Sequence, residues 1–240
     1  MDIKKFILDM VFPIYCISCH QEGVWFCDKC FQKLIFKTEQ TCPICKKIIV
    51  PNGEICFDCK YQNNIDGILV SSFYRKKKEK TMVAKLIHYY KYRFISSIGQ
   101  ILGKVLEKSI LNSTLPLPEI IIPVPLHPRR LRWRGFNQSA ILAHYLGENL
   151  TPGFSIPVYS DILARNRYTQ PQMEIKDKQK RVINAQNAFS LNPKENSKIK
   201  GKTIFLVDDI ATTGSTLFEC ARVLKEGGAK KVYGVVLARQ

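Results

Sequence analysis

Four CxxC pairs dominate the first quarter of the chain and limit what that region can fold into. They are Cys16/Cys19, Cys27/Cys30, Cys42/Cys45 and Cys56/Cys59, which together hold eight of the nine cysteines. Two thiolates three positions apart can bind one tetrahedral ion from a tight turn, and two such pairs complete a four-sulfur site of the kind that suits zinc. A segment of about 45 residues with few large apolar side chains buries too little surface to fold unaided. Metal binding supplies the missing free energy, so the eight sulfurs predict two structural zinc ions.

Three other uses of these cysteines fit less well. A disulfide framework needs an export signal, but Asp9 interrupts the first apolar stretch and bulky Tyr15 precedes Cys16, where a signal peptide requires a small residue. A redox CxxC normally occurs once, at a helix start inside a βαβ unit. The CxxCH pattern of covalent haem is met by Cys16 to His20, yet the other three pairs have no following histidine.

The spacing allows two ways of sharing the ions. In the consecutive arrangement the first pair joins the second and the third joins the fourth, whereas a crossed arrangement fits equally. We favour the consecutive arrangement. Because four protein ligands leave no open position for water or substrate, such sites are structural, and chemistry has to be sought elsewhere in the chain.

Charge separates the cysteine-rich region from the rest of the chain. The first 64 of the 240 residues hold 8 basic and 7 acidic side chains, and residues 65–240 hold 29 and 13, so +16 of the formal charge of +17 lies in the second part. We therefore predict a double zinc-ribbon domain with a short N-terminal helix over 1–64, and a second domain over 65–240. No apolar run approaches the roughly 18 residues that a membrane span needs, and we expect a soluble cytoplasmic protein.

The second domain shows the pattern of an α/β fold. Apolar β-branched runs alternate with longer amphipathic stretches, which is typical of a largely parallel sheet flanked by helices. The expected strands lie near 68–73, 120–124, 161–164, 204–207 and 232–238. The expected helices cover 79–92, 96–111, 135–149, 174–186 and 215–227, the last closed by Gly227 and Gly228.

The most specific segment of this domain is IFLVDDIATTGST, residues 204–216. It combines an apolar strand, two adjacent carboxylates and a hydroxyl-rich turn that leads into a helix. Backbone N–H groups of 212–216 at a helix N-terminus suit a phosphate dianion, and Gly214 permits its close approach. Asp208 and Asp209, at the carboxyl end of the strand, suit vicinal sugar hydroxyls. Phosphate and diol one sugar apart indicate a ribose 5-phosphate site; P-loop and dinucleotide-binding motifs are absent.

This segment resembles the 13-residue loop with which type I phosphoribosyltransferases bind phosphoribosyl pyrophosphate (PRPP). The likeness implies that Asp208 and Asp209 hold the ribose hydroxyls. It also implies that the turn binds the 5-phosphate through Ala211, Thr212, Thr213, Gly214, Ser215 and Thr216. Members that salvage 6-oxopurines carry an aspartate where this chain has Thr212, so that class of substrate is disfavoured.

Two further segments narrow the resemblance. They read IPVPLHPRRLRWRGFNQ over 122–138 and RNRYTQPQ over 165–172. With the CxxC pairs they resemble the ComF/GntX family, whose members look like amidophosphoribosyltransferases and are linked to DNA uptake in natural competence. The likeness covers nearly the whole chain, and RGFNQ together with the PRPP loop is highly specific. It implies a pyrophosphate loop after Ile122 and a mobile hood to which Arg165 and Arg167 belong.

Four arginines fall within six positions of the implied pyrophosphate loop, with no acid among them. They are Arg129, Arg130, Arg132 and Arg134. Guanidinium groups suit pyrophosphate oxygens, and the interleaved Trp133 and Phe136 argue against a merely solvated loop. We expect Mg²⁺ to bridge the pyrophosphate and ribose oxygens with few direct protein ligands.

A second basic stretch raises the question of nucleic acid. It comprises Arg75, Lys76, Lys77, Lys78 and Lys80, followed by the basic and aromatic residues Lys85, His88, Tyr89, Tyr90, Lys91, Tyr92 and Arg93. Phosphate contacts with stacking rings are what unspecific binding of single-stranded DNA needs. The alternative is a basic solvated helix with Leu86, Ile87 and Tyr90 facing the core. The ribbons, near neutral in charge, are poor candidates for the main DNA contact.

Two hypotheses about function follow. The first is a PRPP-binding, phosphoribosyltransferase-like protein that acts in DNA uptake on the cytoplasmic side, including the inner face of the membrane, with single-stranded DNA and competence proteins as candidate partners. The second is an active phosphoribosyltransferase that transfers the sugar phosphate from PRPP to a nitrogen acceptor. The sequence displays neither an acceptor pocket nor a general base, so both hypotheses stand.

Overall fold

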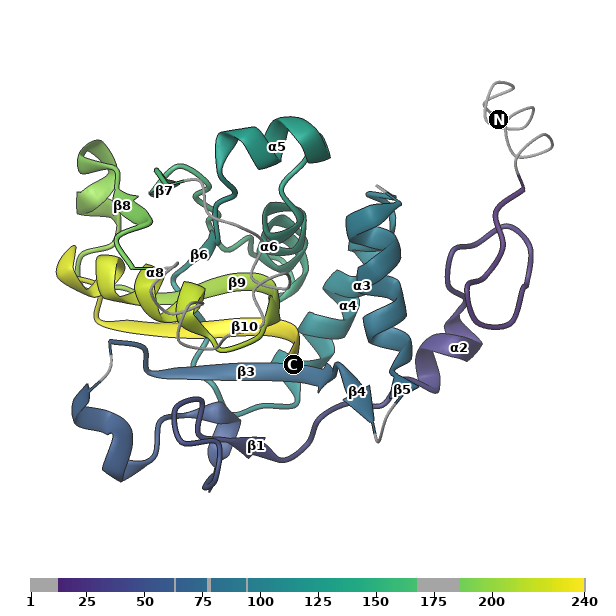
Figure 1. Cartoon of the computed structure of the whole chain (residues 1–240), viewed down its shortest axis with the longest axis horizontal. Helices are drawn as coiled ribbons and strands as arrows, with labels where there is room; N and C mark the ends of the chain where they lie inside the picture. Colours follow the sequence, from purple (N-terminus) through teal and green to yellow (C-terminus); the bar gives the residue numbers. More distant parts are fainter. Residues whose placement is uncertain (1–12, 63, 77–78, 94, 168–185, 240) are drawn as a thin grey trace.

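The computed structural model describes residues 13–62, 64–76, 79–93, 95–167 and 186–239. Its centre is a parallel sheet in the order β3-β10-β9-β6 (Figure 1). The strands are β3 (Gly67–Phe73), β10 (Lys231–Arg239), β9 (Thr203–Ala211) and β6 (Ile120–Pro123). These four strands confirm the sequence prediction. The predicted N-terminal helix lies outside the described residues, as does all but the last residue of the predicted helix 174–186.

Alternation along the strands builds an apolar layer on each face of the sheet. Phe205 and Val207 of β9 pack against α3 (Met82–Tyr92), α4 (Ile98–Leu111) and α6 (Gln138–Asn149). Ile204 and Leu206 face α8 (Ser215–Glu226) on the other side. The result is the helix–sheet–helix layering expected of a parallel sheet, whose strands are buried on both faces.

Local hydrogen bonds explain why α3 starts later than predicted. Glu79–Lys80 (β5) pairs antiparallel with Arg75–Lys76 (β4), so these residues are extended rather than helical. Thr81 caps the helix by accepting the Ala84 N–H at 3.3 Å, and its hydroxyl donates to the carbonyl of Phe73. Inside α3, Leu86, Ile87 and Tyr90 are buried, as the alternative of a basic solvated helix requires.

The predicted helix 135–149 and the arginine-rich stretch before it differ from expectation. The arginines lie on a short helix, α5 (Pro128–Arg134), instead of a loop. Gly135 ends α5 with a φ of +76°, a conformation that favours glycine. Asn137 then caps α6 by accepting the Ser139 N–H at 3.1 Å. The predicted helix 135–149 therefore begins at Gln138, as α6, and the arginines before it form the separate helix α5.

The strand expected near 161–164 is present, but it lies outside the parallel sheet. Leu163–Arg165 (β7) pairs antiparallel with Phe189–Leu191 (β8) in a two-stranded sheet of its own. Leu163 and Phe189 still reach the apolar layer beside α8, which explains why the segment reads as an apolar strand. The 3₁₀ helix η3 (Pro193–Lys198) follows β8.

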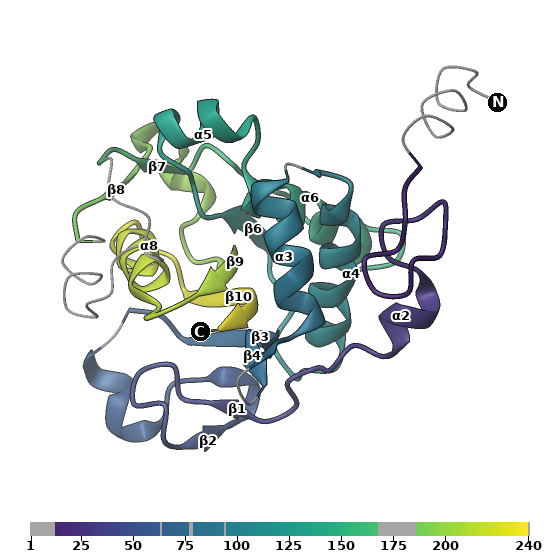
Figure 2. The ribbon, with the colours of Figure 1, turned by 45° about the vertical axis from the view of Figure 1, so that its right-hand side comes forward.

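The cysteine-rich region packs on the second domain in two places (Figure 2). Around α2 (Asp28–Gln32), Phe26 and Leu34 join the core beneath α3 and α4. Its other elements, listed in chain order, are β1 (Gln40–Thr41), β2 (Ile49–Val50), η1 (Pro51–Gly53) and η2 (Phe57–Gln62). They lie along β3.

Gln40 attaches this second part to β3 through its side chain. Its amide nitrogen donates to the Val70 carbonyl at 3.0 Å, and its amide oxygen accepts the Val70 N–H at 3.2 Å. The N–H of Lys37 also donates to the Ser71 carbonyl at 2.8 Å. Gly53 approaches so closely that an added Cβ would lie 2.0 Å from the Ile68 carbonyl oxygen. A side-chain amide and a glycine thus take the place of a further strand.

Candidate functional site

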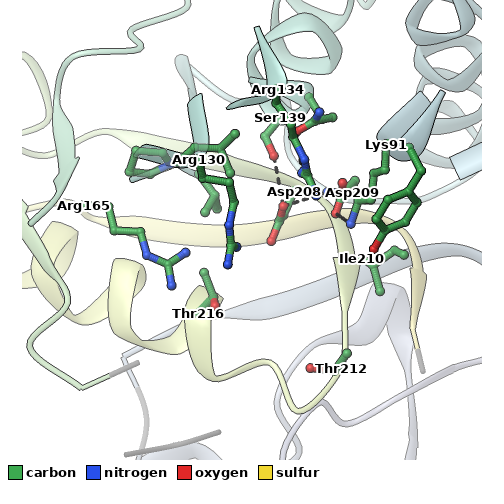
Figure 3. A pocket seen from close by; sticks show the side chains of 15 residues that line it. Lys91, Arg130, Arg134, Ser139, Arg165, Asp208, Asp209, Ile210, Thr212 and Thr216 are labelled. Atoms are coloured by element: carbon green, nitrogen blue, oxygen red, sulfur yellow. Dashed lines mark hydrogen bonds and ion pairs between the residues drawn. The ribbon is translucent and has the colours of Figure 1, made fainter. Parts of the chain in front are cut away.

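A pocket lies where β6 and β9 end, at the carboxyl edge of the sheet (Figure 3). Its walls come from the C-terminal end of α3, from α5, from the start of α6, from β7 and from the turn before α8. This is the usual place for ligands in open parallel sheets, because loops and helix N-termini converge there.

The predicted acidic pair forms the floor of this pocket. Ser139 Oγ donates to Asp208 Oδ1 at 3.0 Å, and the Asp209 N–H donates to the same oxygen at 2.9 Å. Asp209 instead pairs with Lys91, whose Nζ lies 2.7 Å from Asp209 Oδ1. Burial raises the pKa of Asp208 to about 7; the negative charge of Asp209 adds to the shift and Lys91 opposes it. The two neighbouring carboxylates therefore have different partners.

Three of the six predicted arginines reach the pocket. Arg130 and Arg134 lie four positions apart on one face of α5 and line it, whereas Arg129 and Arg132 are exposed on the other side of the helix. Arg165 of β7 lines the opposite wall, and its guanidinium group points toward that of Arg130 (Figure 3). Burial lowers the pKa of Arg165, and the charge of Arg130 adds to this effect.

The remaining predicted hood arginine, Arg167, is exposed and lies outside the pocket. The rest of the predicted hood, 168–172, falls outside the described residues. Arg165 is positioned by β7 and lies over the Phe189 ring of β8, with 5.2 Å from its guanidinium carbon to the ring centroid. The two-stranded β7–β8 sheet therefore fixes one cationic wall of the pocket.

The predicted phosphate turn connects β9 to α8. Gly214 has a φ of +89°, and Thr213 Oγ1 accepts the Ser215 N–H at 3.3 Å. Thr212 and Thr216 line the pocket, and Ala211 is the last residue of the strand. The N-terminus of α8, where the helix dipole and the N–H groups of the first turn favour anions, thus opens toward the acidic pair and the arginines.

Sequence reasoning missed the role of Lys91. It was grouped with the basic stretch, but the structure places it inside the pocket, with only 11% of its side chain exposed. Helical periodicity could have indicated this position, because Lys91 lies four residues after the buried Ile87 and therefore on the same inward face of the helix. Gln138, the last residue of the RGFNQ motif, and Ser139, which directly follows it, also line the pocket at the start of α6; neither is among the predicted site residues.

The rest of the basic stretch is divided by the structure. Arg75, Lys80 and Lys85 are exposed, and Lys77 and Lys78 lie outside the described residues. The predicted aromatic Tyr90 is fully buried, so it is not available for stacking on a base.

The eight cysteines form two compact four-sulfur clusters. One contains Cys16, Cys19, Cys27 and Cys30, and the other contains Cys42, Cys45, Cys56 and Cys59. This confirms the consecutive arrangement.

The sulfur spacing fits zinc. Sγ–Sγ distances are 3.6 Å for Cys19–Cys27, 3.9 Å for Cys16–Cys27 and 3.8 Å for Cys45–Cys56. A tetrahedron with zinc–sulfur bonds of about 2.3 Å has sulfurs about 3.8 Å apart, whereas a disulfide brings them to about 2.05 Å. The two clusters fit two structural zinc ions.

Comparison with known proteins agrees with both regions. Residues 7–60 match the double zinc ribbon domain and residues 142–240 match the phosphoribosyl transferase domain. Competence protein F of Haemophilus influenzae is 31% identical over 237 residues, which cover 95% of this chain and 98% of that protein. The chain belongs to the ComF family.

Other ComF relatives carry related names. The DNA utilization protein YhgH of Escherichia coli strain K12 is 34% identical over 161 residues, covering 65% of this chain and 67% of that protein. Competence protein ComFC of Bacillus subtilis is 27% identical over 221 residues, covering 89% of this chain and 83% of that protein.

Among solved structures, a glutamine PRPP amidotransferase from B. subtilis aligns at 23% identity with a TM-score of 0.38, covering 59% of this chain and 26% of that one.

These relatives are named for competence and DNA utilization, and this chain shares with its family a phosphoribosyl transferase domain. In the part of the chain that the structure describes, no helix has both the length and the hydropathy needed to cross a bilayer.

Proposed function

We propose that this ComF-family protein binds PRPP in the pocket at the end of β9 and acts in DNA uptake on the cytoplasmic side. One observation carries the proposal: a single pocket combines an acidic pair, the N-terminus of α8 and three arginines. These groups complement the diol, the 5-phosphate and the pyrophosphate of one PRPP molecule. The names of the relatives support the setting in DNA uptake.

Each part of the ligand has a proposed partner. Asp208 and Asp209 accept hydrogen bonds from the ribose hydroxyls, and the turn from Ala211 to Thr216 binds the 5-phosphate. Arg130 and Arg134 bind the pyrophosphate, and Arg165 supports it from the hood side. Mg²⁺ enters with PRPP and takes most of its ligands from PRPP oxygens, because one of the two carboxylates is already paired with Lys91.

A specific observation favours transfer chemistry as the second candidate function. Proton removal from an incoming nitrogen acceptor needs a base whose pKa lies near the working pH. The pKa of Asp208, raised to about 7, meets that condition within the pocket. Release of pyrophosphate from PRPP with a candidate acceptor would support this activity, and its absence despite measured PRPP binding would leave binding as the function.

Nucleic-acid contact remains part of the proposal, on a smaller set of residues. Arg75, Lys80, Lys85 and Arg93 are exposed, and Tyr92 is 43% exposed beside the pocket. A single strand held by such phosphate contacts should lose affinity steeply as salt rises. A flat salt dependence would remove DNA from the proposal.

The binding proposal is tested by titrating PRPP and Mg²⁺ into wild type and two variants of α5. Arg130→Ala should weaken binding about 10- to 100-fold, the range for loss of a charge-assisted hydrogen bond. Arg132→Ala is the matched control, because Arg132 is exposed on the same helix outside the pocket. Equal losses in the two variants would show that only the overall charge of α5 matters, and an absence of binding by wild type would reject the site.

A further inference from the structure

Among the described residues, Lys91 is the most deeply buried cation of any ion pair. Its Nζ lies 2.7 Å from Asp209 Oδ1, and the two side chains are 11% and 8% exposed. The partners are separated by 118 positions along the chain, 209 − 91, so the fold itself brings them together. Burying two charges costs free energy unless they meet in good geometry. A buried ion pair at this position therefore suggests a functional role.

The end of α3 that carries Lys91 is fixed to the start of α6. The Tyr90 hydroxyl donates to the Gln138 carbonyl at 2.9 Å, and Tyr90 is fully buried. Its ring also packs against Phe136, with 5.5 Å between the ring centroids. Since α6 supplies the Ser139 hydroxyl to Asp208, one rigid unit places a partner on each carboxylate of the acidic pair.

The acidic pair makes ionisation of Asp208 costly. Burial raises the pKa of Asp208, and the negative charge of Asp209 raises it further. A vicinal diol is bound best when both carboxylates are ionised and can accept its two hydroxyls. Lys91 opposes the rise in the pKa of Asp208, and its contact with Asp209 is to Oδ1, which leaves Oδ2 for a ligand.

We propose that Lys91 is a positioning residue for the ribose diol, acting through Asp209: its ammonium group holds one oxygen of that carboxylate and turns the second oxygen toward the hydroxyls. This deepens the proposed function and rests on it. Lys91 thereby makes diol recognition possible, while the anionic ends of PRPP are left to the arginines and to the turn before α8.

Other charged groups also face the acidic pair. Lys91 comes from α3, Arg130 and Arg134 come from α5, and Arg165 comes from β7. On α8, burial raises the pKa of the Cys220 thiol, and the charge of Asp208 adds to this effect. The arginines all act in the same direction as Lys91, so the test has to separate its contribution from theirs.

The experiment uses Lys91→Gln, which removes the charge but retains a hydrogen-bond donor. Ribose 5-phosphate and pyrophosphate are titrated separately into the full-length zinc-loaded protein between pH 6 and 9. Wild type should lose ribose 5-phosphate affinity below about pH 7. In Lys91→Gln this midpoint should rise by about one unit or more, since an adjacent cation lowers a carboxyl pKa by about 1–3 units. Pyrophosphate affinity should change less than about threefold.

Two further variants complete the comparison. Lys91→Arg should restore the wild-type midpoint, and Lys85→Gln, an exposed position on the same helix, should leave it unchanged. An unchanged midpoint in Lys91→Gln would overturn the proposal, because a purely structural lysine lowers affinity without moving the pH profile. An equal loss of pyrophosphate affinity would also overturn it, by making Lys91 a direct anion ligand.

A ligand-free measurement separates failure of this inference from failure of the proposed function. Lys91→Gln should have a lower free energy of unfolding than wild type at pH 8.5. This stability gap should narrow at pH 6, because the acidic pair without Lys91 takes up a proton. If wild type binds neither ligand while this gap behaves as expected, the PRPP site is rejected and the charge role of Lys91 stands. A gap independent of pH would reject that role.

Discussion

Replacing Asp208 with asparagine should stabilise the folded protein while it abolishes PRPP binding. The pKa of Asp208 rises from an ordinary value of 3.8 to about 7, mainly because burial disfavours the charged carboxylate. A shift of about three units corresponds to at most about 4 kcal/mol, at about 1.4 kcal/mol per unit. Asparagine keeps an oxygen that can accept the hydrogen bonds from Ser139 and from the Asp209 N–H. The substitution therefore removes the buried charge at little cost in packing.

The sign and the pH range of this effect follow from linkage. Because the folded pKa is the higher one, the folded state carries the full cost of the ionised carboxylate above about pH 7. That cost declines as pH falls and disappears below the unfolded pKa near 3.8. In thermal unfolding, Asp208→Asn should be more stable than wild type at pH 8.5, and this gain in unfolding free energy should fall by about half at pH 5.5. For a chain of this length, 1 kcal/mol shifts Tm by about 2–4 °C.

The neighbouring substitution provides the contrast. Asp209→Asn leaves Lys91 without its counter-ion, and loss of one partner of a buried pair costs about 3–5 kcal/mol. Two adjacent carboxylates should thus respond to the same chemical change with opposite signs. The reasoning is refuted if both variants shift stability in the same direction, or if the gain for Asp208→Asn does not depend on pH.

Three further predictions concern the cysteine-rich region and its junction with the sheet. Elemental analysis should find about two zinc ions per chain, and chelation should unfold the ribbons; less than about one zinc per chain would contradict the four-sulfur clusters. Gln40→Ala should destabilise the protein by about 2–4 kcal/mol, because it strips the Val70 N–H and carbonyl of their partner, whereas the exposed Gln100→Ala should be nearly neutral in chemical unfolding. Gly53→Ala should fail to fold stably at 37 °C, since its Cβ would overlap the Ile68 carbonyl; a soluble, fully cooperative variant would show that the close approach is not required.

Sequence reasoning succeeded where local pattern decides the structure. The spacing within each CxxC pair places two sulfurs in one turn, so the eight ligands and two four-sulfur sites were predictable, whereas the spacing alone did not decide between consecutive and crossed pairing. The apolar runs of β3, β6, β9 and β10 are buried on both faces, which explains why they could be found without knowing their order.

Sequence reasoning failed where tertiary contacts decide the structure. The arginines of α5 offer no apolar periodicity, because the helix buries none of its residues, so a helix was not expected there. The place of strand β7 outside the parallel sheet was not predictable, because periodicity does not specify a strand's partner. The contact between Lys91 and Asp209 joins distant parts of the chain, and the charge of Lys91 suggested a surface position instead.

The attachment of Gln40 and Gly53 to β3 has a consequence for how the protein behaves in concentrated solution. As the outermost strand of the parallel sheet, β3 would otherwise present unpaired backbone groups, which template association with other chains. The cover is an irregular segment that depends on a metal for its shape. Zinc bound to the cluster beside β3 would therefore also protect the protein against aggregation, since a chain that lost this ion would expose an unpaired strand edge to its neighbours.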